Sequence, residues 1–150
     1  MGGNYSIIRS RNQLKEGDHI SWPFNIPFWY RIILFRSQLR HEAIVVSPSV
    51  GDRMTRVCHA RQLNSEESLP SGAVSSFGSA KSHVVCEEDI DLHALMEALE
   101  LRRYDYAPSE CLSPEEAIDN CRSKINVPFV FCALFNNCKH FAKWCKTGKK

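Results

Sequence analysis

The sequence predicts an α+β fold, in which a small antiparallel sheet packs against helices. Segments rich in β-branched residues come first along the chain, and segments with helical periodicity follow them. A chain of 150 residues has the length of one domain. Its 43% hydrophobic and 24% charged residues are ordinary values for a globular protein and argue against wholesale disorder.

The strands are expected in the first part of the chain. Residues 14–20 read as a turn that leads into a first strand, and residues 41–47 read as a second strand because they are rich in Ile and Val. Residues 48–52 have turn chemistry, and residues 55–60 return as a third strand. A hairpin centred near Val50 makes His41 and His59 cross-strand neighbours, about 5 Å apart at Cβ. A bulge would shift this register.

The helices are expected in the second part, after a long loop over residues 64–82 and a short strand over residues 83–86. Residues 89–101 are expected to form a helix with carboxylates in its first turn. The sequence Ser113-Pro114-Glu115-Glu116 predicts a capping box that begins a helix reaching residue 125. A last helix is expected from Cys138 to about Lys146, with Asn136-Asn137 before it and Gly148 ending it.

The net charge of +2 hides strong segregation along the chain. Residues 1–40 carry a net charge of +4, residues 41–120 carry −9, and residues 121–150 carry +7. This pattern does not suit a uniformly basic nucleic-acid binder, and we expect no nucleic-acid partner. Two cationic ends are compatible with binding to an anionic membrane surface or with ion pairing between the basic ends and the acidic middle of the chain.

Seven cysteines occur without a recognisable secretory signal or an apolar segment that could span a bilayer. The odd number and the lack of a signal predict a reducing compartment with free thiols. We therefore expect a cytoplasmic protein that associates peripherally with membranes.

Two features near the N-terminus suggest how the chain meets a membrane. Residues 1–6 fit the N-myristoylation pattern, with Gly2 as the acceptor. Residues 22–35 are rich in aromatic side chains flanked by arginines, which suits a segment that enters a membrane interface. The aromatic residues expected to contact the membrane are Trp22, Phe24, Phe28, Trp29 and Tyr30. The alternative is that they pack on the sheet as core residues.

The last predicted helix offers a reactive thiol. Cys138 lies in its first turn, where free backbone N–H groups and the positive helix end lower a thiol pKa. The N–H groups of Asn137 and Cys138 could also hold a developing oxyanion. His140 is expected to point outward, so His41 and His59 are the better partners for proton transfer. Each signal is weak alone, because buried cysteines and strand histidines are usually structural. A zinc site is disfavoured, since the sequence has no CxxC or HxxxH pair, and we expect no metal and no cofactor.

The sequence Asn136-Asn137-Cys138-Lys139-His140-Phe141 resembles the Asn-Cys-Glu-His-Phe block of the lecithin:retinol acyltransferase-like family. His41 at the start of one strand and His59 after Val57-Cys58 fall in the family's order. The resemblance spans most of residues 14–148 and implies a permuted papain-like, NlpC-type thiol hydrolase fold. Residues 14–150 are then the catalytic domain, after an N-terminal tail over residues 1–13.

The resemblance implies roles for three residues. Cys138 is the nucleophile, His41 is the general base and then acid, and His59 is the polarising third member. The implied reaction is attack on a phospholipid ester through an acyl-thioester on Cys138, followed by transfer to an acceptor or to water. Lys139 and Glu42 depart from the family pattern, where Glu and an aromatic residue are usual.

Two other functions compete with a phospholipid acyltransferase or phospholipase A. One is a membrane-associated adaptor of the same fold with weak catalysis, and the other is a thiol peptidase or amidase. The sequence specifies neither the acyl donor and acceptor nor the oligomeric state.

Overall fold

The computed structural model describes residues 4–23, 40–62, 80–98, 100–125, 127, 129–132 and 138–149. Within them, the strands and helices follow one another along the chain in this order: β1 (Tyr5–Ile7), η1 (Arg11–Gln13), β2 (His19–Pro23), β3 (Arg40–Ser47), β4 (Met54–Gln62), β5 (Ala80–Asp91), α2 (Leu92–Ala98), β6 (Arg102–Tyr104), η2 (Pro108–Glu110), α3 (Pro114–Arg122), β7 (Phe129–Cys132) and α4 (Cys138–Thr147). The described strands form one seven-stranded sheet in the order β1-β6-β2-β3-β4-β5-β7. All neighbouring strands of this sheet pair antiparallel, which confirms the α+β class.

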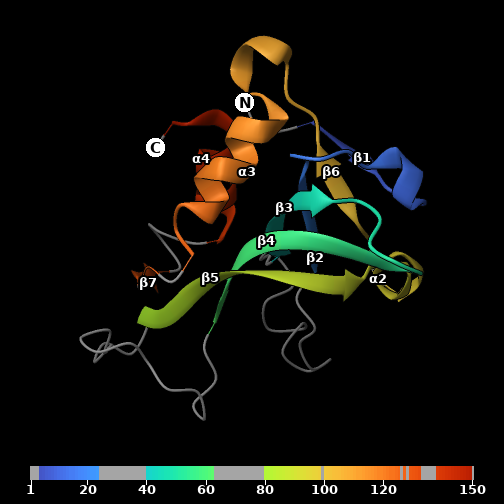
Figure 1. The fold of residues 1–150 in the computed structure, drawn as a ribbon, viewed down its shortest axis with the longest axis horizontal. Coiled ribbons are helices and arrows are strands. Elements are labelled where there is room, and N and C mark those ends of the chain that lie inside the picture. Colours follow the sequence, from blue (N-terminus) through green and yellow to red (C-terminus); the bar gives the residue numbers. More distant parts are fainter. Residues whose placement is uncertain are drawn as a thin grey trace.

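Helices α3 and α4 cover one face of the sheet and lie against each other (Figure 1). Alternate residues of β3 and β4, including Ile44, Val46 and Cys58, form a buried cluster with Ala142 and other residues of the two helices. The intervening residues of these strands belong to a second cluster on the other face, together with residues of β2 and α2. The sheet is therefore buried on both faces.

The hairpin of β3 and β4 keeps the predicted strands and shifts their register. Val45 pairs with Val57 and Ile44 with Cys58, two residues away from the predicted pairing. The hairpin turns about residues 51–52 rather than Val50, and a bulge between Val45 and Ser47 changes the register by one residue. Because the shift is even, His41 and His59 stay on a common face.

Strand β5 is much longer than the predicted strand over residues 83–86, and it includes three residues assigned to the following helix. Charged side chains in β5 are matched by partners: Arg56 binds Asp89 across the β4–β5 ladder, and Arg122 of α3 binds Glu87. These pairs let an acidic segment remain extended. Helix α2 is correspondingly shorter, and the Asp91 carboxylate accepts a hydrogen bond from Ala94 N at 3.2 Å.

Strands β1 and β6, which the sequence did not predict, pair with each other at one edge of the sheet. Ile8, just after β1, is buried in the second cluster, so the described part of residues 1–13 packs on the sheet. The predicted boundary after residue 13 stays a prediction. The long loop over residues 64–82 lies mostly outside the described residues.

Helix α3 confirms the predicted capping box. The Ser113 hydroxyl accepts a hydrogen bond from Glu116 N, and the Glu116 carboxylate accepts one from Ser113 N. The helix ends at Arg122 rather than at residue 125. Helix α4 ends at Thr147, and Gly148 follows with a φ of +74°, as the sequence predicted for a helix stop.

A disulfide joins Cys58 of β4 to Cys121 of α3, with Cα atoms 6.3 Å apart. Both residues are fully buried in the cluster under the helices. The prediction of free thiols throughout is therefore wrong for this pair. The pairing depends on how α3 packs on the sheet, which the spacing of the cysteines does not reveal.

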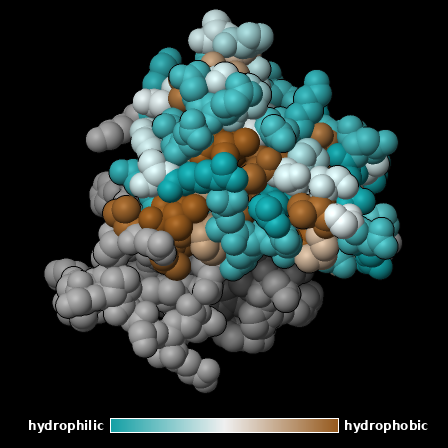
Figure 2. Space-filling view, viewed as in Figure 1, coloured by the Kyte–Doolittle hydropathy of each residue, from teal (hydrophilic) through white to brown (hydrophobic). Residues whose placement is uncertain are grey.

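The described surface in the view of Figure 1 is mostly hydrophilic (Figure 2). Hydrophobic residues show through it in separate areas rather than as one broad patch. Among the described residues, no helix is long and apolar enough to cross a membrane.

Candidate active site

The structure brings the two predicted catalytic histidines into direct contact. His41 is the second residue of β3, and His59 lies in β4 next to it in the sheet. His41 Nε2 is 2.5 Å from His59 Nδ1, and the ring centroids are 4.7 Å apart in an edge-on arrangement. The predicted proximity is confirmed, while the catalytic roles of the two residues stay predictions.

Two residues that the sequence did not single out extend this pair. His59 Nε2 is 3.1 Å from a carboxylate oxygen of Glu88, and the other oxygen is 3.5 Å from the Cys86 thiol. Cys86 lies directly opposite His59 in the β4–β5 ladder, and Glu88 is two residues further along β5. Only the register between the two strands could have revealed these neighbours, since the residues are far apart in sequence.

With Glu88 ionised, the hydrogen bonds allow one arrangement of protons on the two imidazoles. A carboxylate at Glu88 accepts from His59 Nε2–H, which leaves His59 Nδ1 as an acceptor. His41 Nε2 then donates to His59 Nδ1, so the His41 Nδ1 is the nitrogen that can take a proton. This is the tautomer that a general base at His41 needs.

Trp22 forms one wall of the site. It pairs with His41 across β2 and β3, and the two ring centroids are 5.0 Å apart. Trp22 also packs against the second core cluster. The structure therefore places this aromatic residue on the sheet, as the core alternative predicted for it. The other predicted membrane contacts, Phe24, Phe28, Trp29 and Tyr30, lie outside the described residues, as does Gly2.

The alternation along β3 places the two imidazoles on the face of Trp22 and the second cluster. Helix α4, which begins at Cys138, packs on the other face. Near its C-terminal end the Lys146 ammonium donates to Gly17 O, whose amide donates to Val45 O. This contact ties the C-terminal end of α4 to Val45, in the second half of β3. The Cys138 side chain and Asn137 are outside the description, so the predicted thiol and oxyanion positions stay predictions.

Glu42, the residue that departs from the family pattern, takes part in a second polar network on the α4 face. Its carboxylate is 2.6 Å from His19 Nε2, and His19 Nδ1 is 2.9 Å from the Tyr106 hydroxyl. His19 and Glu42 are almost fully buried. Burial lowers the pKa of His19, although the hydrogen bond to Glu42 opposes this change. Both nitrogens of His19 are engaged in this buried network, on the face of the sheet opposite to the His41–His59 pair.

The remaining described thiols are poorly suited to nucleophilic attack or lie elsewhere. Cys145 is buried in the core under α4, and burial raises its pKa to about 12. Cys58 and Cys121 are paired. Cys111 is partly exposed and lies just before α3. Cys86, beside His59 and Glu88, is the described thiol nearest to the histidine pair. His140 is exposed, as the sequence predicted.

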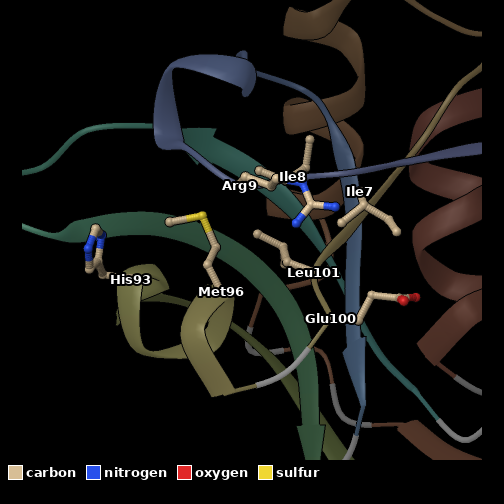
Figure 3. Close-up of a pocket in the computed structure, with 7 residues that line it drawn as sticks. All are labelled: Ile7, Ile8, Arg9, His93, Met96, Glu100 and Leu101. Atoms are coloured by element: carbon tan, nitrogen blue, oxygen red, sulfur yellow. The ribbon is translucent and has the colours of Figure 1, made fainter.

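A pocket of about 490 Å³ lies away from the histidine pair, between the end of β1, α2 and the start of β6. Figure 3 shows Met96 of α2 reaching toward Ile8 and Arg9. The pocket is lined by Ile7, Ile8, Arg9, His93, Met96, Glu100 and Leu101. None of them is a predicted catalytic residue, so the pocket does not extend the candidate site.

The comparisons with known proteins agree with the resemblance read from the sequence. The family model described as "Lecithin retinol acyltransferase" matches residues 30–150, which include His41, His59 and Cys138. No curated protein matches the chain significantly. The family suggests an enzyme with acyltransferase or phospholipase-like activity in general. Since the match spans most of its length, the chain belongs to the lecithin retinol acyltransferase family.

Proposed function

We propose that the protein is a thiol-dependent acyltransferase or phospholipase A that acts on glycerophospholipid esters. The observation that supports this most is the hydrogen-bonded series His41–His59–Glu88, because it sets the protonation pattern of a general base. Family membership supports the same class of chemistry.

The proposed reaction has two steps. His41 takes the proton of the Cys138 thiol, and the thiolate attacks the ester carbonyl to form an acyl-thioester while His41 returns the proton to the leaving lysophospholipid. An amine, an alcohol, a lysophospholipid or water then gives its proton to His41 and attacks the thioester, which breaks the C–S bond and releases Cys138 to recover the proton from His41. Backbone N–H groups at the start of α4 would stabilise the oxyanion of both steps.

Because α4 and the imidazoles belong to different faces, the proposal requires the thiol to meet His41 beyond the start of β3. Trp22, whose ring lies tilted beside His41, would then line the approach of the acyl ester.

The decisive experiment is to incubate the protein with labelled phosphatidylcholine vesicles and locate the acyl adduct by mass spectrometry. We expect an adduct on Cys138 that is lost in Cys138→Ala and retained in the matched control Cys111→Ser. The absence of both adduct and lysolipid would overturn the proposal. An adduct on Cys86 instead would identify Cys86, beside His59, as the nucleophile in place of Cys138.

We also propose that the N-terminal region binds the membrane surface peripherally. Gly2 would carry a myristoyl chain, and the aromatic residues after Trp22 would add a second contact, since one acyl chain binds only marginally. Removing both, by Gly2→Ala together with Phe24→Ala, Phe28→Ala, Trp29→Ala and Tyr30→Ala, should reduce vesicle binding of the lipidated protein. Unchanged sedimentation with vesicles would contradict this. Vesicle binding by a wild type without lipid turnover would instead favour a membrane-associated adaptor.

A further inference from the structure

The three side chains behind His41 form a set of donors that the spacing of the sequence concealed. His59, Cys86 and Glu88 each offer one atom, and these atoms all lie within 4.8 Å of one another. They come from the central part of β4 and β5, the two long neighbouring strands in Figure 1. Because the ladder fixes their backbone positions, the set is held by the sheet rather than by a loop.

The distances from Glu88 to its two neighbours are close to the edges of a tetrahedral metal site. Zinc bonds to N, O and S atoms measure about 2.0–2.3 Å, which separates neighbouring ligand atoms by about 3.3–3.7 Å. Glu88 lies 3.1 Å from His59 Nε2 and 3.5 Å from Cys86 Sγ, through its two different carboxylate oxygens. Small side-chain rotations would therefore bring all three donors to one ion.

The donor types select the ion. A thiolate and an imidazole are ligands that zinc prefers, whereas magnesium and calcium prefer oxygen atoms. Three protein ligands leave one tetrahedral position for water, which distinguishes an accessible site from a closed structural one. Access from solvent exists, because the Glu88 side chain is 39% exposed while His59 is nearly buried.

The surroundings also fit a metal-binding imidazole. Histidine ligands usually give their second N–H to a neighbouring acceptor, and His59 Nδ1 lies against His41 Nε2. The acidic neighbours of Glu88 are occupied elsewhere, since Glu87 pairs with Arg122 and Asp89 with Arg56. Glu88 is thus the carboxylate of β5 that faces His59.

We propose that His59, Cys86 and Glu88 form a reversible zinc site whose occupation switches off His41. This consequence, but not the binding itself, rests on the proposed function. Zinc on His59 Nε2 requires the His59 proton to lie on Nδ1, from which it is donated to His41 Nε2. His41 then carries its own proton on Nδ1 and can no longer accept one from the thiol. The number of protons on the two imidazoles is unchanged, and the Cys86 thiol releases its proton to solvent.

Zinc binding can be measured without any activity, by competition of the full chain with a chromophoric zinc chelator. Using Cys138→Ala as the background removes the other candidate thiol. We expect one ion to bind, and either Cys86→Ser or Glu88→Gln to weaken binding at least about tenfold. The control Cys111→Ser, which changes a partly exposed thiol outside the set, should not weaken it. Equal affinity in the Cys86→Ser and Cys111→Ser proteins would overturn the site.

Cobalt provides a direct signature of the sulfur ligand. Added Co²⁺ should give a near-ultraviolet thiolate-to-metal absorption in the Cys138→Ala protein, and Cys86→Ser should abolish it. Retention of this absorption in Cys86→Ser would contradict the assignment, even if overall affinity had changed. Thermal melting of each variant shows whether it remains folded.

The coupling to catalysis needs one further measurement. Each protein is compared with its own metal-free rate of lysolipid release as zinc is added. We expect inhibition of the wild type, and a shift of the inhibiting concentration by at least about tenfold in Cys86→Ser. Zinc binding to an active wild type without inhibition would overturn the coupling. A protein without lipid turnover would contradict the proposed function while leaving the binding result valid.

Discussion

At the scale of single residues, the buried pair His19–Glu42 is the contact whose loss we expect to lower the stability of the fold most directly. Glu42→Ala leaves the buried His19 Nε2–H without its acceptor and opens a cavity, and we expect the free energy of unfolding to fall by about 3–5 kcal/mol. Glu42→Gln keeps an acceptor for His19 Nε2 and should cost only about 1–2 kcal/mol. Urea unfolding of both variants measures the difference. Equal losses would show that shape, rather than the hydrogen bond to His19, is what matters at this position.

The same pair predicts a pH dependence of stability. Burial lowers the pKa of His19 in the folded state. The unfolded chain therefore binds a proton at His19 at a pH where the folded chain does not. Stability should therefore decrease as pH falls below about 6.5, the ordinary pKa of histidine. Glu42, Lys139 and Lys146 are the charged groups that act on His19, and Glu42 opposes the decrease.

Thermal melting between pH 7.5 and 5 tests this expectation, with His19→Gln as the comparison. The variant should lose part of the pH dependence while remaining less stable overall. A wild-type melting temperature that rises toward pH 5 would contradict it.

Glycines at two turns give a matched pair of predictions at the scale of elements. Gly17, before β2, has a φ of +84°, and a Cβ there would lie 2.6 Å from Pro114 Cα at the start of α3. Gly51, in the turn between β3 and β4, has a φ of +70° but no heavy atom within 4 Å of such a Cβ. We expect Gly51→Ala to cost about 1–2 kcal/mol from backbone strain alone.

Gly17→Ala adds a backbone clash to the same strain and should cost about 3 kcal/mol or more. Chemical denaturation of the two variants gives the comparison. If Gly17→Ala is no worse than Gly51→Ala, the turn before β2 does not approach the start of α3 as closely as the structure indicates.

The elements also show what the sequence could predict. The start of α3 was predictable, because Ser113 and Glu116 satisfy each other within one turn of chain. The end of β5 was not, because Asp89 remains extended through its pairing with Arg56 on another strand. In the candidate site, the His41–His59 contact followed from a hairpin. The addition of Cys86 and Glu88 depended on the β4–β5 register, which no local pattern encodes.

At the scale of the whole molecule, the Cys58–Cys121 disulfide links the sheet to the helical layer across a sequence separation of 63 residues. A loop of that length implies a stabilisation of about 4 kcal/mol on the chain-entropy model. We expect reductant to lower the urea midpoint of the wild type by a corresponding amount. The double variant Cys58→Ala and Cys121→Ala should unfold at a midpoint that reductant does not change.

Cys111→Ser is the control for this experiment, because it removes a thiol outside the disulfide and should keep the sensitivity to reductant. A wild type whose midpoint is the same with and without reductant would show that the two sulfurs are not joined in solution. The sequence could not predict the pairing, since Cys58 and Cys121 meet only after α3 has packed on β4.

The His19–Glu42 contact has a consequence for how the family diversifies. Replacing either residue alone leaves the other as a buried polar group without this partner. The two positions should therefore change together during evolution. An alignment of relatives should therefore show correlated substitution at positions 19 and 42, with an aromatic residue at 42 accompanied by a different residue at 19. The substitutions tolerated at either position would then depend on which residue already occupies the other.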